Sequence, residues 1–231
     1  MDPNTTGSKE LKFHPIESIS KKAIIAIWVN ICVLVLVAPL SVYILSIDTS
    51  VTPAKEDEMR VGLLAVAALC GIGVQVISFI VAGVMFMIWE YRAYRNAMML
   101  ENPDVTEQAM KSAGVDVVGG WLIPLYNLFK PYQVMTVLWE ASDPKPRTDD
   151  VFGKRDPKVP VGMKIWWAAW IVGLLIDRVD QMMKGTGTGP VGTVVSVGAH
   201  VVAGVLVVRL IKSITERETH KIHALQRGGE P

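Results

Sequence analysis

The sequence predicts an all-α, polytopic helical membrane protein with four transmembrane helices. Two observations lead to this prediction. The 231 residues are 51% apolar with a mean hydropathy of +0.36, and the apolar residues gather in long stretches without charge. Residues 23–47 and 61–89 contain no charged side chain, and each stretch is longer than the ~20 residues that a helix needs to cross a hydrocarbon core.

The first two spans are therefore expected at residues 23–47 and 61–89. The third is expected at residues 161–183, where the first sixteen positions are apolar except for Lys164. The fourth is expected at residues 190–211, because this stretch is uncharged as far as Val208, with His200 near its middle. Together the four spans define a membrane domain over residues 23–214.

Positively charged residues predict the orientation of these spans. Lysine and arginine favour the N-terminal tail (1–22), the region between the second and third spans, and the C-terminal tail (215–231), whereas acidic residues outnumber them in the loop at 48–60. The positive-inside rule then places both termini and the central region in the cytoplasm of a multi-pass plasma membrane protein. Within the central region, residues 142–160 are rich in proline and charge and are expected to form a linker.

Residues 117–139 are too apolar for an ordinary loop and too interrupted for a spanning helix. The first thirteen carry no charge and would extend about 20 Å as a helix, a length typical of re-entrant or interfacial segments. Pro124 and Pro131 each remove a backbone donor, and Asn127 lies between them as a candidate cap. We expect a proline-broken segment that is either re-entrant or an interfacial hairpin, because a full fifth span would conflict with the charge pattern.

The second span is expected to continue as a helix beyond the membrane, since helix formers follow it without a breaker as far as Leu100. Trp89, Arg92 and Asn96 are three and four residues apart, so they share one face of this extension. That face could bind an anionic group or a neighbouring row of carbonyls. The alternative is a juxtamembrane helix whose arginines reach lipid phosphates.

The motifs in this region are recognisable. Trp89-x-x-Arg92-x-x-x-Asn96, followed by Gly120-Trp121-x-x-Pro124-x-x-Asn127-Leu128-x-x-Pro131-Tyr132, resembles the bacterial membrane family called domain of unknown function 4328. The resemblance covers most of the chain and implies a multi-span helical architecture in a bacterial cell membrane, but it implies no activity. Its implied key positions are Trp89, Arg92, Asn96, Trp121, Pro124, Asn127 and Pro131.

Asn30, Gln75 and His200 place polar side chains inside predicted spans. Such groups are functional candidates by default, although hydrogen bonds between helices would also explain them. His200 could relay protons, bind a metal, or have a structural role.

Asp177, Arg178 and Asp180 form a charged cluster where the third span ends. Asp177 and Asp180 are three residues apart and share a helical face. We expect these charges at the outer interface, where they would form a local ion pair, close a cavity, or lie solvated at a helix end.

Several function classes find no support in the sequence. It contains no zinc-protease His-Glu-x-x-His motif, no Gly-x-Ser-x-Gly elbow and no phosphate-binding glycine loop, so we expect no enzyme activity, cofactor or metal. The two cysteines, Cys32 and Cys70, fall inside predicted spans and suggest no disulfide. No basic stripe predicts nucleic-acid binding.

The favoured function is a membrane-anchored interaction or regulatory module. Its expected partners are the lipid bilayer and either a protein at the cytoplasmic loop or a second copy of the chain. The alternative is a subunit of an oligomeric transporter or channel that uses the broken segment at 117–139. An intramembrane enzyme is less favoured.

Overall fold

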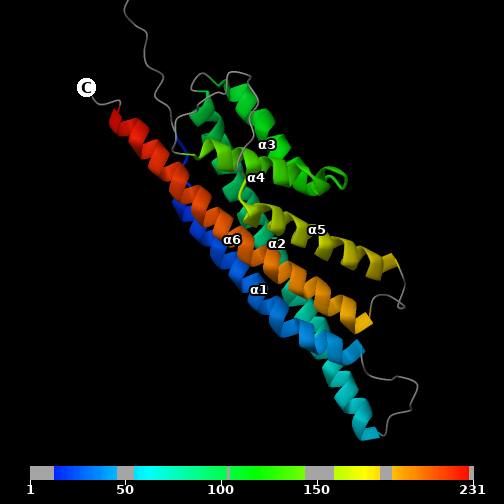
Figure 1. Ribbon diagram of the computed structural model, residues 1–231. Helices are drawn as coiled ribbons and strands as arrows, with labels where there is room; N and C mark the ends of the chain where they lie inside the picture. The colour runs from blue at the N-terminus through cyan, green and yellow to red at the C-terminus, as the bar shows by residue number, and fades with distance from the viewer. Residues whose placement is uncertain (1–12, 46–54, 103–104, 144–158, 183–188, 229–231) are drawn as a thin grey trace, which may run out of the picture. The chain divides into compact units, whose positions relative to one another are not determined.

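A computed structural model of the protein describes residues 13–45, 55–102, 105–143, 159–182 and 189–228. Every regular element within these ranges is a helix (Figure 1), which confirms the all-α prediction. The expected tails, the loop at 48–60 and the linker at 142–160 lie partly outside them. The elements are α1 (Glu17–Leu45), α2 (Lys55–Glu101), α3 (Glu107–Leu122), the 3-10 helix η1 (Tyr126–Leu128), α4 (Lys130–Ala141), α5 (Val161–Met182) and α6 (Gly189–Gly228).

Among the described residues, three helices are long and apolar enough to cross a membrane: α1, α2 and α6. Only 17%, 11% and 33% of their most apolar stretches are buried inside the protein. This low burial is expected of helices whose apolar surface faces lipid, because lipid tails replace a protein core there. Both α2 and α6 continue well beyond their uncharged stretches, which end at Trp89 and Val208.

The structure gives three candidate spans rather than the four predicted. The segment predicted as the third span does form a helix, α5. However, Lys164 near its start and Asp177 near its end leave only residues 165–176 without charge. Twelve helical residues extend about 18 Å, whereas a hydrocarbon core is about 30 Å thick, so the composition of α5 does not by itself identify a span.

The chain divides into two compact units. Unit 1 comprises residues 1–17, 90–155 and 214–231, and unit 2 comprises residues 18–89 and 156–213. The long helices α2 and α6 contribute to both units. Unit 1 therefore contains the charged extensions of these helices, and unit 2 contains their apolar parts.

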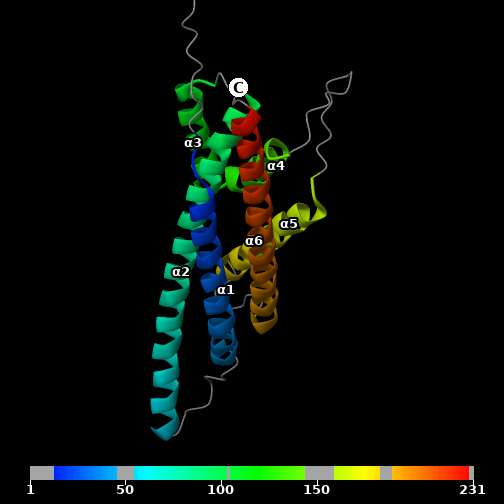
Figure 2. The same ribbon diagram turned by 90° about the vertical axis from the view of Figure 1, so that its left-hand side faces the viewer.

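Unit 2 consists of α1, α5 and the apolar parts of α2 and α6. Helices α1 and α2 run antiparallel (Figure 2): Asn30 on α1 meets Gln75 on α2, and Val37 meets Gly71. Helix α6 comes close to α1 at Gly204, where a Cβ atom would lie 2.7 Å from Ile31 Cδ1. The buried apolar side chains of unit 2 include Ala23, Ile27, Ile31, Ala82, Phe86, Trp89, Met163, Trp166, Ala203 and Ile211.

Unit 1 is organised around the hairpin of α3, η1 and α4. Helix α3 begins at the N-cap Thr106, whose side chain accepts a hydrogen bond from the Ala109 amide. It ends where Ile123 adopts an extended conformation (φ −86°, ψ 120°), because a residue before proline is disfavoured in the helical region. Helix α4 then starts with Pro131 in its first turn, a position at which the missing amide donor costs nothing.

The broken segment predicted at 117–139 is thus a helix, a turn and a second helix. The turn follows Pro124, whereas Gly119 and Gly120 lie within α3. Gly120 permits a close approach between the two arms, since a Cβ atom there would lie 3.0 Å from Lys130 Cγ. The choice between a re-entrant and an interfacial position stays a prediction.

The extension of α6 packs against α4 through three polar contacts. Lys221 Nζ donates to the carbonyl of Ala141, the last residue of α4, over 2.8 Å. A cation at this position favourably meets the negative end of the helix dipole. The Arg217 guanidinium lies 4.0 Å from the centre of the Trp139 ring and 3.4 Å from a carboxylate oxygen of Asp143. The unit's buried apolar residues include Ile16, Ala93, Ala97, Val117, Val134, Met135, Leu138, Ile214 and Ile222.

Replacing Leu138 by alanine should destabilise unit 1. Leu138 is fully buried on α4, and such truncations cost about 2–5 kcal/mol. Thermal unfolding of the detergent-solubilised full-length protein should show a lower midpoint. The matched control is Leu125→Ala, because Leu125 is 73% exposed in the hairpin turn. Equal midpoints for L138A and the unchanged protein would contradict the assigned core.

Candidate functional site

Unit 1 contains a fully buried carboxyl group at Glu90, directly after the uncharged stretch of α2. Its Oε2 accepts a hydrogen bond from the Trp121 indole Nε1 over 2.7 Å. Its Oε1 has no hydrogen-bond partner among the described residues. Burial raises the pKa of Glu90 to about 8, against the smaller lowering effect of the Trp121 hydrogen bond.

A second buried carboxyl group belongs to Glu218, ten residues beyond the uncharged stretch of α6. The side chain of Asn96 forms a hydrogen bond with it. Within the described part of the chain, Glu218 Oε1 also lacks a partner. Burial raises the pKa of Glu218 to about 8, and the Asn96 hydrogen bond partly offsets this rise.

Asn96 connects three segments that are far apart in the sequence. Its Oδ1 accepts from the backbone amide of His14 over 2.8 Å, and its Nδ2 donates to the His14 carbonyl over 2.8 Å. Together with the hydrogen bond to Glu218, these contacts tie the start of the described chain, the extension of α2 and the extension of α6 to one buried amide. The contacts among Asn96, His14 and Glu218 and the separate Glu90–Trp121 hydrogen bond are together called the unit 1 network below.

The chemistry of the unit 1 network is that of protonated carboxyls. A carboxyl with a pKa near 8 is mostly neutral at pH 7, so it can donate a hydrogen bond as well as accept one. Such groups hold segments together and bind or release protons near neutral pH. A metal site is not indicated, because among the described residues no three His, Cys, Asp or Glu side chains are grouped to hold an ion.

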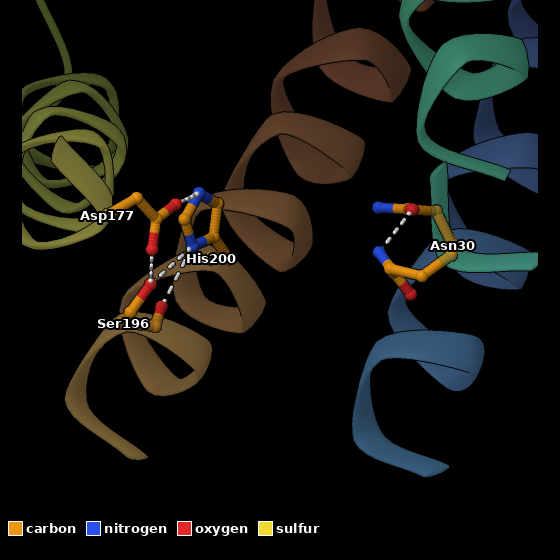
Figure 3. A network of polar contacts seen from close by, with 5 residues as sticks. Asn30, Asp177, Ser196 and His200 are labelled. Carbon is orange, nitrogen blue, oxygen red and sulfur yellow. Dashed lines mark hydrogen bonds and ion pairs between the residues drawn. The ribbon is translucent and has the colours of Figure 1, made fainter. Parts of the chain in front are cut away.

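A second polar cluster lies in unit 2, between α5 and α6 (Figure 3). Ser196 Oγ donates to Asp177 Oδ1 over 2.6 Å. Nδ1 of His200 lies 2.9 Å from the Ser196 carbonyl oxygen and 3.3 Å from Ser196 Oγ, while its Nε2 lies 3.8 Å from Asp177 Oδ2. The Trp170 ring meets the imidazole edge-on, with 5.7 Å between ring centres.

The other two intramembrane polar residues of the prediction contact each other. Gln75 Nε2 donates to Asn30 Oδ1 over 3.0 Å, and Ser78 Oγ donates to the same oxygen over 3.1 Å. Gln75 Oε1 is buried and has no partner among the described residues. These contacts are the interhelical hydrogen bonds that the sequence offered as the simpler explanation.

The seven motif residues do not converge on one catalytic centre. Asn96 and Trp121 belong to the unit 1 network, and Trp89 and Pro131 are buried. Arg92 is half-buried and Pro124 is exposed in the turn. Asn127 donates its backbone amide to the Ile123 carbonyl, but its Oδ1 is buried without a partner in the described ranges, so this oxygen does not provide the expected cap.

The charges at the end of α5 include one, Asp177, that contacts the neighbouring helix α6. Asp177 contacts Ser196 and His200 on α6, while Arg178 is exposed. The side chain of Asp180 lies outside what the structure describes. Asp177 is therefore best considered with His200, a combination that the sequence did not predict.

The buried carboxyls Glu90 and Glu218 were missing from the predicted site. Glu218 fell in the expected C-terminal tail, yet α6 extends to Gly228. A signal was present, since Ile211, Ile214, Glu218 and Ile222 recur at three- and four-residue spacing and are all buried. For Glu90 the sequence contains no comparable pattern that would predict burial, because a charged side chain at the end of a membrane span is usually solvated.

The fold and these clusters define the class of protein as an all-α protein with three candidate membrane-spanning helices among the described residues. The extensions of two of these helices, α2 and α6, form part of the compact unit 1. The chain belongs to the family domain of unknown function 4328 (DUF4328), which it matches over residues 52–216. This confirms the resemblance seen in the motifs. No curated protein and no solved structure matches the chain.

Removing the two buried carboxyls should flatten the pH dependence of stability. Both groups have a folded-state pKa of about 8 against an ordinary value of 4.5, so the folded protein binds more protons between these values than the unfolded chain. Their contribution to stability is therefore complete below pH 4.5 and is lost as the pH rises through about 8.

Thermal midpoints measured across this pH range test the effect. The unchanged protein should lose stability as the pH rises, and the double variant E90Q/E218Q should lose less. The control is Glu216→Gln, which removes an exposed carboxylate from the same extension of α6. A double variant with the same slope as E216Q would show that the buried carboxyls are not linked to folding.

Proposed function

We propose that the protein is a multi-pass, membrane-anchored interaction module in which unit 1 lies on the cytoplasmic side and inserts the turn of its α3–α4 hairpin into the inner leaflet. The observation that carries this proposal is the exposure of the turn. Six large apolar side chains of the turn are between 41% and 73% exposed: Leu122, Ile123, Leu125, Tyr126, Leu128 and Phe129.

Exposed apolar surface of this kind marks a membrane or protein interaction site. The distribution of charged residues along the hairpin favours a membrane. No charged residue occurs from Val117 to Phe129. The nearest charges on the two arms, Asp116 and Lys130, form an ion pair of 3.5 Å behind the turn. The turn, residues 122–129, is thus apolar and uncharged, and it is called the tip below. The ion pair of Asp116 and Lys130 lies where the two arms of the hairpin leave it.

The dimensions of the tip favour shallow insertion over a deep re-entrant loop. From Asp116 to Leu122 the helix rises about 9 Å, which is close to the ~5–10 Å to which interfacial helices are buried. Backbone groups at that depth need partners. The amides of Asn127, Leu128 and Phe129 donate to carbonyls within the turn.

Chain continuity supports a position of unit 1 next to the bilayer. Its Glu90 follows directly on the uncharged stretch of α2. We place both termini in the cytoplasm on the distribution of lysine and arginine. An even number of crossings then requires α5 to be a fourth span, with Lys164 and Arg178 reaching the headgroups at its two ends.

A second candidate is a subunit of an oligomeric transporter or channel. The polar cluster of Asp177, Ser196 and His200 favours it, since ionisable groups among membrane helices often mark ion or proton pathways. Purified protein in liposomes would then conduct ions or protons. Tight liposomes containing the folded protein would leave the interaction module as the sole proposal.

Cysteine accessibility tests the proposed function. In a variant with Cys32 and Cys70 replaced by serine, Gln226→Cys should react with a membrane-impermeant maleimide only from the cytoplasmic side. Leu125→Cys should react several-fold more slowly in lipid bilayers than Ser112→Cys, because Leu125 lies in the tip whereas Ser112 is exposed elsewhere on α3.

Two results would contradict the proposal. Labelling of Q226C from outside would overturn the orientation. Equal rates for L125C and S112C in bilayers would show that the tip lies in water, even if the orientation is right.

A further inference from the structure

The cluster of Asp177, Ser196 and His200 has a geometry that fixes the proton positions on the imidazole. Nδ1 of His200 lies 2.9 Å from the Ser196 backbone carbonyl oxygen. A carbonyl oxygen only accepts hydrogen bonds, so Nδ1 carries a hydrogen. In the neutral ring Nε2 is then unprotonated and presents a lone pair.

That lone pair faces another acceptor. Asp177 Oδ1 already receives the Ser196 hydroxyl hydrogen over 2.6 Å, a short distance typical of a hydrogen bond to a charged carboxylate. Asp177 Oδ2 lies 3.8 Å from His200 Nε2. This separation is too long for a hydrogen bond, as expected when two acceptors meet without a proton between them.

We infer that Asp177 and His200 form a proton-binding site in which one proton from water is held between His200 Nε2 and Asp177 Oδ2. Hydronium gives up the proton and leaves as water, and no other bond breaks. The imidazole becomes an imidazolium that donates to the carboxylate, so two facing acceptors become an ion pair. This inference goes beyond the proposed function and does not depend on it.

The packing around the ring holds it in this orientation. The edge-on contact with Trp170 restricts the imidazole on one side. Gly173 on α5 provides the space for it, since a Cβ atom at this position would lie 2.6 Å from His200 Cε1. The side chains of His200 and Asp177 are 22% and 46% exposed.

Among the side chains that the structure describes, few other charges face the pair. On α6, no Asp, Glu, Lys or Arg occurs from Pro190 to Val208, and the uncharged stretches of α1 and α2 contribute none either. On α5 the charged neighbours of Asp177 are Arg178, which is exposed, and Asp180. Among the described side chains, the carboxylate of Asp177 is a charged group that the imidazole contacts.

His200 and Asp177 lie at defined distances from the ends of α6 and α5. His200 is ten residues from Pro190, and Asp177 is five residues from the last residue of α5. At ~1.5 Å per residue these positions lie about 15 Å and 8 Å from the nearby helix ends. His200 and Asp177 therefore lie toward the ends of α6 and α5 that the α5–α6 connection joins.

Nuclear magnetic resonance of the full-length protein in lipid nanodiscs tests the inference, with ¹⁵N-labelled histidine and ¹³C-labelled aspartate. We expect neutral His200 to show the tautomer protonated at Nδ1. As the pH is lowered, the His200 nitrogens and the Asp177 carboxyl carbon should change together, with one midpoint. In His200→Asn this step of the Asp177 signal should disappear, while His223→Asn, which removes an exposed histidine, should leave it unchanged.

Several outcomes would overturn the inference. These are a His200 tautomer protonated at Nε2, separate midpoints for the two residues, or an Asp177 step that persists in H200N. Stoichiometric zinc binding at neutral pH that perturbs both residues would also overturn it and would identify a metal site instead. The unchanged protein alone decides the first two points, so a variant that fails to fold does not prevent the test.

Discussion

The buried side-chain amide of Asn96 is the contact on which unit 1 depends. An amide removed from water without partners costs about 1–3 kcal/mol, and Asn96 avoids this cost by hydrogen bonds to the backbone of His14 and to Glu218. His14 is 82 residues away in the sequence. One side chain therefore ties together the segment before α1, the extension of α2 and the extension of α6, and the hairpin of α3 and α4 packs onto this frame.

Both units contain acidic side chains with an acceptor atom that lacks a hydrogen-bond donor. In unit 1, Glu90 and Glu218 each bury an oxygen that has no hydrogen-bond partner among the described residues. In unit 2, His200 Nε2 faces Asp177 Oδ2 across 3.8 Å. In each case a proton is the missing donor. A buried acceptor without a donor is costly, so the surroundings favour proton uptake at these positions in unit 1, and the same reasoning leads to the proton site in unit 2.

Hydropathy and turn chemistry were sufficient to predict much of the fold. The uncharged stretches of α1, α2 and α6 and the break at Pro124 follow from composition and from proline stereochemistry. The extent of α6 was underestimated, because the charged residues after Val208 conceal an apolar stripe that includes Ile214 and Ile222. The pairing of Asp177 with His200 could not be predicted, since it depends on the register between α5 and α6, which no local pattern determines.

Hydrogen exchange of an Asn96→Leu variant in lipid nanodiscs tests most directly whether this amide holds unit 1 together. Leucine has a similar size but cannot form the hydrogen bonds to His14 and Glu218. The backbone amide of His14 and those at 214–222 should lose protection together, while those at 30–45 in α1 keep theirs. A loss of protection confined to α2 around position 96, with both distant segments unchanged, would contradict the central role of Asn96.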